Sequence, residues 1–320
     1  MKIHLIVFIL LFANTAHAAS IDGYPHKPIR MAIPMEPGGP VDITARLVAK
    51  RLTEKLGQPV LVENRAGAGG SLAPTYVARS APDGSVILFM SKSSLLSKLL
   101  LATNSTYDML GELAPITQTD SQETILVANA KVPAQSLKEL IDLARSTPGK
   151  LSYASNGVGS GNHLNIELFK SGAKIDIVHV PYKGQSPAMT DLLSGRIDVT
   201  SLGMALATQS IKTGQIKALA ITGSKRNKLL PDLPTFAEQG IPGLENGSWK
   251  GFLAPKGTSD VVIQKLYSEI VQVMNSSDAS KLLEGGEEVV GSSPEAFRQF
   301  LIKEQELWRK VIKDIGLNNS

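Results

Sequence analysis

The stretch Ile29–Val41, which reads IRMAIPMEPGGPV, decides the fold of this chain. A short apolar strand enters a loop of glycine and proline, and a helical pattern begins near Val41. A second unit of strand, glycine loop and helix occupies Leu151–Lys170. The first N–H groups of a helix have no intrahelical acceptor, and residues with little side chain let a small anion approach them. Two such loops predict a clamp for a small carboxylate.

The N-terminal 18 residues have the pattern of an export signal. Lys2 precedes the apolar run Leu5–Ala13, and small residues before Ala19 suit cleavage there. The run is about half of the roughly 20 residues that a membrane-spanning helix needs, so a retained anchor is the weaker alternative. The sequence has no cysteine, which excludes a lipid-modified cysteine at the cleavage point. We therefore expect a soluble periplasmic protein from which residues 1–18 have been removed.

The composition is that of a globular protein with frequent turns, since 42% of the residues are hydrophobic and 28 are glycine. Removal of the signal leaves enough chain for two lobes, each with its own core. The formal charge of +4 comes from basic residues that are scattered without an Arg/Lys stripe or interleaved aromatic residues. This pattern argues against nucleic acid as a partner, whereas a mild positive charge helps to attract anions.

Short apolar strands alternate with helical patterns, which predicts an α/β protein with mostly parallel sheets flanked by helices. The expected strands are 29–34, 60–63, 86–90, 125–127, 151–154, 175–180, 199–202, 218–221 and 251–254. The expected helices are 41–56, 136–146, 162–171, 187–194, 261–275 and 304–313.

The two glycine loops each begin their own series of strands and helices, which predicts two lobes. Ligands of open parallel sheets bind beyond the carboxyl ends of the strands, so two facing lobes enclose a ligand cleft. We expect residues 19–125 and 251–320 to form the first lobe and residues 126–250 to form the second. A tandem arrangement, in which the chain does not return to the first lobe, is the alternative.

The candidate ligand-binding residues of the first loop are Glu36, Pro37, Gly38, Gly39 and Pro40. A proline is tolerated in the first turn of a helix, where its missing N–H is not needed. A carboxylate beside an anionic ligand is unfavourable unless a cation intervenes. Glu36 therefore faces solvent, pairs with a lysine or meets an amino group of the ligand. A tight turn that binds nothing is the alternative reading of the loop.

The second loop supplies the candidates Ser155, Gly157, Gly159, Ser160 and His163. Its hydroxyl and N–H groups suit an oxyanion, and a structural histidine is the alternative for His163. The fingerprint of dinucleotide-binding proteins is incomplete, because Asn162 stands where the third glycine is required. The Gly-x-Ser-x-Gly turn of hydrolases is absent as well, because Val158 replaces its first glycine.

The remaining candidates are Ser91 and Lys92 after strand 86–90, Tyr182 and Lys183 after strand 175–180, and Trp249. Lys92 is expected to meet a second ligand carboxylate or Glu36, and Trp249 to form a wall of the cleft. Solvated side chains are the alternative for both lysines. The three histidines left after removal of the signal lack the spacing of metal ligands, and no nucleophile has a recognisable base. We therefore expect no metal, no cofactor and no catalysis.

Several short motifs follow one another over nearly the whole mature chain: Pro37–Gly39 with Asp42, Leu56–Pro59, Glu63–Gly70, Ala81–Gly84, Pro148–Leu151, Ser155–His163, His179–Gly184, Leu230–Thr235 and Trp249–Pro255. Together they resemble the tripartite tricarboxylate transporter solute-binding family, also called Bug or TctC-like. The resemblance implies a two-lobed periplasmic binding fold of type II that closes on a carboxylate. It also implies delivery of the ligand to a membrane permease of one large and one small subunit, and we expect a monomer.

Within that family, the loops matched by Pro37–Pro40 and Ser155–Ser160 hold a ligand carboxylate, largely through backbone groups and water. This chain departs from the family at Met35 and Glu36, at Pro40–Val41 and over Ser91–Leu113. The expected function is capture of a small organic carboxylate or amino acid. A ligand sensor that reports to a membrane receptor uses the same cleft and stays open. An exported serine hydrolase built on Ser155 or Ser160 is the weaker alternative.

Overall fold

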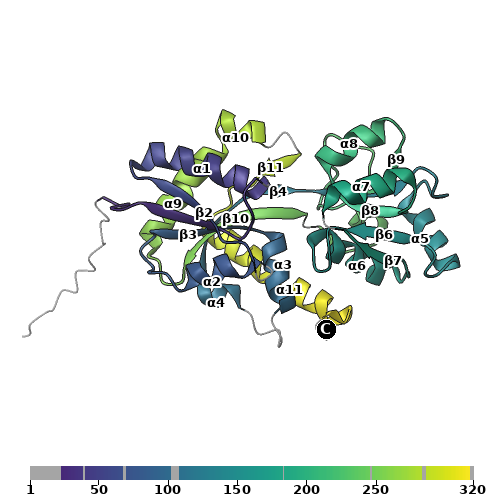
Figure 1. Cartoon of the computed structure of the whole chain (residues 1–320), viewed down its shortest axis with the longest axis horizontal. Coiled ribbons are helices and arrows are strands. Elements are labelled where there is room, and N and C mark those ends of the chain that lie inside the picture. The colour runs from purple at the N-terminus through teal and green to yellow at the C-terminus, as the bar shows by residue number, and fades with distance from the viewer. Residues whose placement is uncertain are drawn as a thin grey trace, which may run out of the picture.

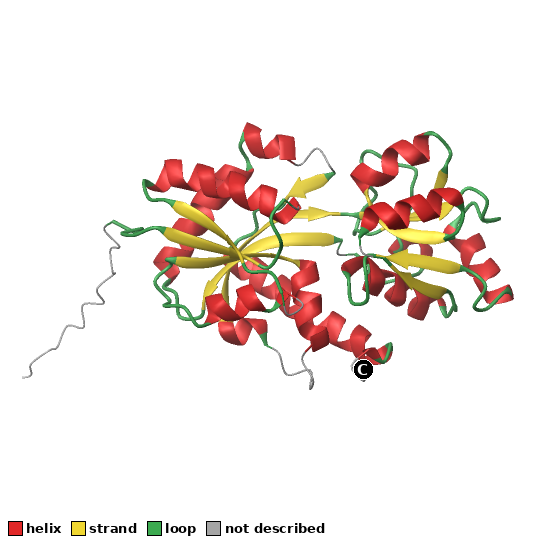
Figure 2. Cartoon of the chain, in the orientation of Figure 1, coloured by secondary structure: helices red, strands yellow, loops and turns green. Residues whose placement is uncertain are grey.

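The structure is a computed structural model that describes residues 23–38, 40–67, 70–101, 108–182, 184–245, 247–282 and 286–317. The expected export signal, Gly39 and Lys183 lie outside these ranges. Two sheets lie side by side along the long axis of the molecule, and helices cover each of them (Figures 1 and 2). Within the described ranges, no helix is both long enough and apolar enough to cross a membrane.

The first sheet has six strands in the order β11-β4-β10-β3-β1-β2. Its strands are β1 (Ile29–Ile33), β2 (Val60–Asn64), β3 (Val86–Ser91), β4 (Leu113–Gln122), β10 (Ser248–Pro255) and β11 (Glu287–Val289). β2, β1 and β3 are parallel, so the connections that leave their carboxyl ends emerge at one edge of the sheet. β10 runs antiparallel to β3 and β4, and β11 runs antiparallel to β4.

Helices cover both faces of the first sheet because its side chains are apolar on both sides. The helices α1 (Pro40–Leu56) and α9 (Asp260–Met274) share one buried cluster with β1, in which Leu52 and Leu266 are fully buried. The opposite face is covered by α2 (Leu72–Ala78), α3 (Lys92–Leu101) and α11 (Pro294–Asp314). Short helices α4 (Met109–Glu112) and α10 (Ser277–Leu282) complete this part, which we call the first lobe.

The second sheet has five strands in the order β7-β6-β8-β5-β9. Its strands are β5 (Thr124–Asn129), β6 (Ser152–Ser155), β7 (Val178–Pro181), β8 (Val199–Gly203) and β9 (Ile216–Ile221). Its helices are α5 (Leu137–Ser146), α6 (Gly161–Ala173), α7 (Gln185–Ser194) and α8 (Met204–Lys212). Apolar side chains of α5 and α6 fill one face and those of α7 and α8 fill the other. We call this sheet and its helices the second lobe.

The chain crosses between the lobes at two places. It leaves β4 at Gln122 and begins β5 at Thr124, and it returns to the first sheet at Ser248, where β10 begins. The predicted α/β architecture with two helix-flanked sheets is confirmed. Most strands of each sheet run in one direction, and the exceptions are β10 and β11 in the first sheet and β5 in the second.

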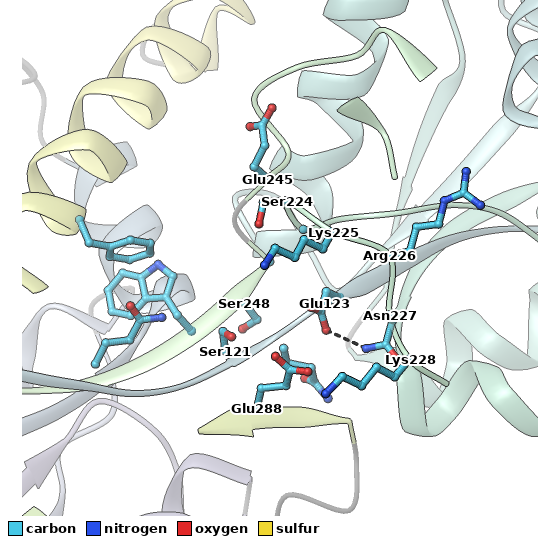
Figure 3. A pocket seen from close by; sticks show the side chains of 16 residues that line it. Ser121, Glu123, Ser224, Lys225, Arg226, Asn227, Lys228, Glu245, Ser248 and Glu288 are labelled. Carbon is cyan, nitrogen blue, oxygen red and sulfur yellow. Dashed lines mark hydrogen bonds between the residues drawn. The ribbon is translucent and has the colours of Figure 1, made fainter. Parts of the chain in front are cut away.

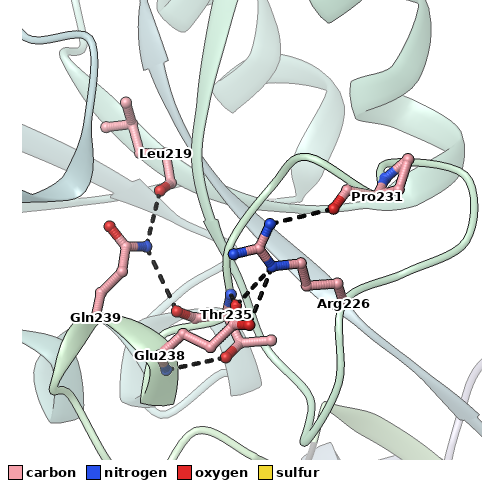
Figure 4. A network of polar contacts seen from close by, with 6 residues as sticks. All are labelled: Leu219, Arg226, Pro231, Thr235, Glu238 and Gln239. Atoms are coloured by element: carbon pink, nitrogen blue, oxygen red, sulfur yellow. Dashed lines mark hydrogen bonds and ion pairs between the residues drawn. The ribbon is translucent and has the colours of Figure 1, made fainter.

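A polar network attaches the segment after β9 to the second sheet (Figure 4). Thr235 and Glu238 bond each other's backbone: the Glu238 N–H donates to Thr235 Oγ1 at 3.1 Å, and the Thr235 N–H donates to Glu238 Oε2 at 2.8 Å. This reciprocal capping box starts a short 3₁₀ helix, Ala237–Gln239. Arg226 Nε donates to the Glu238 carboxylate at 2.9 Å. The segment Leu230–Thr235, one of the family-like motifs, is therefore held structurally.

Candidate functional site

The first glycine loop follows β1 and is open to solvent. Met35 packs against the core, whereas Glu36, Pro37 and Gly38 are exposed. Gly38 has φ +91°, a conformation that favours glycine, and a Cβ atom placed there would meet nothing within 4 Å. The loop is therefore a glycine turn with free space in front of it, as the sequence predicts.

Asp42 in the first turn of α1 fixes the shape of this loop. Its side chain is 3% exposed and accepts a hydrogen bond from the Gly38 N–H at 3.0 Å. Arg46 donates to both of its oxygens at 2.9 Å, and Asn64 donates to one of them at 2.9 Å. The hydrogen bonds from Arg46 hold the pKa of this carboxyl well below its usual range. The family-like motifs of the sequence include Asp42 and Asn64, but not Arg46.

The serine hydroxyls of the second loop are directed inward rather than toward solvent. Ser155 Oγ donates to the Gly157 carbonyl at 3.1 Å, and Ser160 Oγ donates to the same carbonyl at 2.7 Å. Ser160 is also the N-cap of α6, where its Oγ accepts a hydrogen bond from the His163 N–H. These hydroxyls shape the turn, which corrects the expectation that they hold an oxyanion themselves.

Backbone amides, not hydroxyls, are the available donors of the second loop. The N–H groups of Asn156, Gly157, Gly159 and Ser160 are all bonded within the loop or to α6. The N–H groups of Val158, Gly161 and Asn162 have no hydrogen-bond partner among the described residues. Val158 is itself 67% exposed. Free N–H groups at the start of a helix are the donors that anions use at helix termini.

Two histidines lie directly beneath this loop. His163 Nδ1 accepts the Gly159 N–H at 3.0 Å, and its ring stacks on His179 with 4.1 Å between ring centroids. His179 Nε2 lies 2.6 Å from Ser155 Oγ. Burial, together with the charge that His179 would carry, lowers the pKa of His163 to about 4. His163 therefore orients the loop in its neutral form, which was the structural alternative for this residue.

The contact between Ser155 and His179 has the residue types of a nucleophile and its base, a pairing that the sequence did not reveal. Ser155 is fully buried, so a substrate cannot reach its hydroxyl. The second ring nitrogen of His179 donates to no described carboxylate, whereas in the hydrolase triad the histidine donates its Nδ1–H to an aspartate. The pair is arranged for a structural contact.

Two predicted site residues lie in the interior of the first lobe. Lys92 is 2% exposed, donates to the Gly247 carbonyl at 3.1 Å and lies 4.5 Å from the centre of the Trp308 ring. Trp249 is 1% exposed and donates its indole N–H to Glu304 at 2.8 Å. The expectation that Lys92 meets Glu36 or a ligand is therefore wrong, whereas Trp249, although almost fully buried, lines part of a cavity beside the crossings between the lobes. Both fill the core, where burial lowers the pKa of Lys92.

Ser91 and Tyr182, two further predicted site residues, both have structural contacts. Ser91 is buried at the end of β3, where it pairs with Lys250 of β10. Tyr182 follows β7, half-buried, and its hydroxyl donates to Asp191 at 2.7 Å. Its N–H donates to the Ser155 carbonyl at 2.9 Å, so this residue supports the second loop through its backbone.

A contact that the sequence did not indicate joins the second loop to the first lobe. A Cβ atom on Gly159 would lie 2.3 Å from Leu100 Cδ1, so the side chain of this α3 residue lies against the loop. Leu164 of α6 is fully buried within the apolar cluster of the first lobe. β1 and β3 are parallel neighbours, so the first loop and α3 leave the same edge of the sheet. That edge faces the second loop.

A cavity of about 490 Å³ lies beside the two crossings rather than at the glycine loops (Figure 3). Its walls come from both lobes and include Glu123, Lys225, Glu245 and Glu288. Asn227 also lines the cavity, and its side-chain amide donates to the Glu123 carboxylate at 3.2 Å. No residue of either glycine loop lines this cavity. In the described part of the chain, no group of three or more acidic or histidine side chains is placed to hold a metal ion.

The chain is similar to known solute-binding proteins. A family model described as "Tripartite tricarboxylate transporter family receptor" matches residues 44–317. The structure of the periplasmic binding protein BugD has 34% identity and a TM-score of 0.72, covering 92% of this chain and 99% of that one. MatC from Rhodopseudomonas palustris with bound malate has 30% identity and a TM-score of 0.73, covering 90% of this chain and 100% of MatC.

A second R. palustris protein, solved with adipate, has 33% identity and a TM-score of 0.72, covering 92% of this chain and 98% of that protein. The family match includes β6 and the second glycine loop, and it begins within α1, after the first glycine loop. The chain therefore belongs to the receptor family of the tripartite tricarboxylate transporters, a family of periplasmic solute-binding proteins that includes those of the Bug type.

Proposed function

We propose that this chain is a periplasmic receptor that captures a small dicarboxylate between its two glycine loops. The observation that carries the proposal is the set of unpartnered N–H groups of Val158, Gly161 and Asn162. Unpartnered amides at and just before a helix N-terminus can satisfy a carboxylate through hydrogen bonds and through the helix dipole. The exposed turn at Gly38 lies on the edge of the first lobe that faces them and offers a place for the rest of the ligand.

The ligand class is supported by the relatives. Malate and adipate are both dicarboxylates, and the proteins solved with them are at least 30% identical to this chain. The contacting set that we propose is Glu36, Pro37, Gly38, Gly39 and Pro40 in the first loop, with Val158, Gly161 and Asn162 in the second. Gly157 and Gly159 allow the second turn to form, since both have positive φ. Ser155, Ser160 and His163 hold its shape.

The lobes close on the ligand in this proposal. Apolar side chains at both loops are exposed, namely Ile43 in α1, just after the first loop, and Val158 in the second loop. Their burial on closure adds to the binding energy, at roughly 25 cal/mol per Å² of apolar surface. The lobes correspond to residues 19–125 with 251–320 and to residues 126–250, and they pivot at the two crossings. Release then delivers the ligand to a membrane permease of one large and one small subunit.

The chain acts by binding alone in this proposal, without a metal or cofactor, as a monomer exported by removal of residues 1–18. The burial of Ser155 supports a non-catalytic role, because the best-placed nucleophile near the second loop is closed to substrate. The scattered basic residues likewise favour small anions over nucleic acid as partners.

A thermal-shift screen of the mature chain against dicarboxylates, tricarboxylates and amino acids tests the proposal. A ligand at 100 times its dissociation constant adds about 2.7 kcal/mol, so we expect malate or a related dicarboxylate to raise the melting temperature by several degrees. Gly38→Trp should abolish the shift, whereas Gly214→Trp, at another positive-φ glycine with open space around it, should not. The proposal is contradicted if no carboxylate in the panel raises the melting temperature of the wild type.

A further inference from the structure

A column of three rings supports the second glycine loop from below. Tyr153 of β6, His179 of β7 and His163 of α6 stack in that order, with 4.8 Å and 4.1 Å between successive ring centroids. The two histidines reach opposite ends of the loop. His179 contacts Ser155 Oγ at its start, and His163 contacts the Gly159 N–H near its end. The column therefore fixes the loop at two points.

The contact at Gly159 depends on the protonation of His163. Nδ1 accepts a hydrogen bond, so it carries a lone pair and the ring proton of the neutral form is on Nε2. An imidazolium donates from both nitrogens and accepts at neither. Protonation would break this bond, leave the N–H of a buried glycine without a partner and place a charge 4.1 Å from the second imidazole.

The surroundings of the pair favour its neutral form. The charged groups that act on both histidines are Glu167 and Lys170, which belong to α6. They offset each other, because Lys170 Nζ donates to the Glu167 carboxylate at 2.7 Å. Tyr153 of β6 donates its hydroxyl to the same carboxylate. α3 presents Leu100, an apolar side chain, to the loop above the rings.

We propose that His163 and His179 are positioning residues for the second loop, and that the loop keeps its ligand-binding form only while the His163 ring is neutral. Neither needs to touch the ligand, because the proposed donors are the amides of Val158, Gly161 and Asn162. The inference rests on the proposed function in one respect, namely that this loop receives the carboxylate. It predicts that protonation of His163 releases the loop and so weakens binding of the dicarboxylate.

Three variants test whether the loop needs the hydrogen-bond acceptor of His163 or only the bulk of its ring. His163→Asn keeps an acceptor oxygen near the position of Nδ1 but does not titrate, whereas His163→Leu keeps the bulk and removes the acceptor. We expect His163→Leu to weaken dicarboxylate binding about tenfold or more, and His163→Asn to stay within about threefold of the wild type. His26→Asn is the control, because His26 is exposed and lies before β1, far from the second loop in the sequence. It should leave the affinity unchanged. Equal affinities of the Leu and Asn variants would overturn the proposal.

The pH profile is the readout that a merely structural histidine would not affect. The ratio of the dissociation constants of wild type and His163→Asn cancels the titration of the ligand itself. We expect a ratio near one at pH 7.5 that rises as the pH falls toward 4, because only the wild type gains the charge. A ratio that stays flat over this range contradicts the proposal.

A ligand-free measurement keeps this inference separate from the proposed function. Hydrogen exchange of a peptide over residues 155–163 should be faster in His163→Leu than in His163→Asn. If His163→Leu does not fold, His179→Phe takes its place, since it keeps the stack and loses the contact with Ser155. Equal exchange in the variants overturns the positioning role, whereas a failure of the wild type to bind any carboxylate overturns only the function.

Discussion

Glu36 is the residue whose charge we expect to select among ligands. It is exposed in the first loop and makes no hydrogen bond or ion pair with the described residues. Glu36→Gln keeps the shape and removes the charge. Malate should bind as well or better, because a like charge is lost, whereas aspartate should bind about 2 to 5 kcal/mol more weakly if its ammonium pairs with this carboxylate.

Calorimetric titration of both ligands against wild type and Glu36→Gln measures this difference. The two ligands differ by a hydroxyl and an ammonium group, so their comparison isolates the charge at that position. Glu306→Gln, at an exposed glutamate on α11, is the matched control. Unchanged affinities of both ligands would remove Glu36 from the account of specificity.

The sequence predicted which residues form the two loops better than it predicted what each side chain does. Glycine and helix-start patterns are local, so Gly38, Gly157 and Gly159 were found from spacing alone. The direction of a side chain depends on partners far along the chain. Ser155 is bound by His179, and Lys92 is buried against Trp308, and neither partner can be read from the neighbouring sequence.

At the level of elements, every strand predicted from an apolar run has a counterpart in the two sheets, from β1 to β10. β4 was missed because its sequence is polar, with Thr117, Thr119 and Asp120 all buried. These polar side chains are satisfied by tertiary contacts, such as the ion pair of Asp120 with Lys250 at 2.6 Å. α3 was missed because it follows β3 directly, without the loop that would mark its start.

The contact of α3 with the second loop predicts a stability effect at Gly159. Gly159→Ala should cost more than the roughly 1 to 2 kcal/mol of a positive φ, because the added Cβ overlaps Leu100. Gly214→Ala has a similar φ with open space around it, and should show the backbone cost alone. Urea denaturation of each variant measures the free energy of unfolding.

The same comparison in a Leu100→Ala background tests the contact itself. There the cost of Gly159→Ala should fall to that of Gly214→Ala, since the overlapping side chain has gone. An undiminished cost would mean that α3 does not hold the second loop.

At the scale of the whole molecule, the two lobes are joined by a packed apolar contact as well as by the two crossings. Leu164 of the second lobe is buried among first-lobe side chains, including Leu95 and Leu99 of α3. Interiors are close-packed, so a closing motion that pivots at the two crossings should keep this contact rather than open it. The exposed loops at Gly38 and Val158 lie outside it and remain free to approach each other.

The central claim is that both loops clamp one ligand. Hydrogen exchange of the wild type, with and without the dicarboxylate selected by the thermal-shift screen, measures this most directly. We predict that peptides over residues 35–43 and 155–163 both become protected at saturation, with one dissociation constant describing both. Protection of only one peptide, or of neither while the ligand is bound, would contradict the clamp.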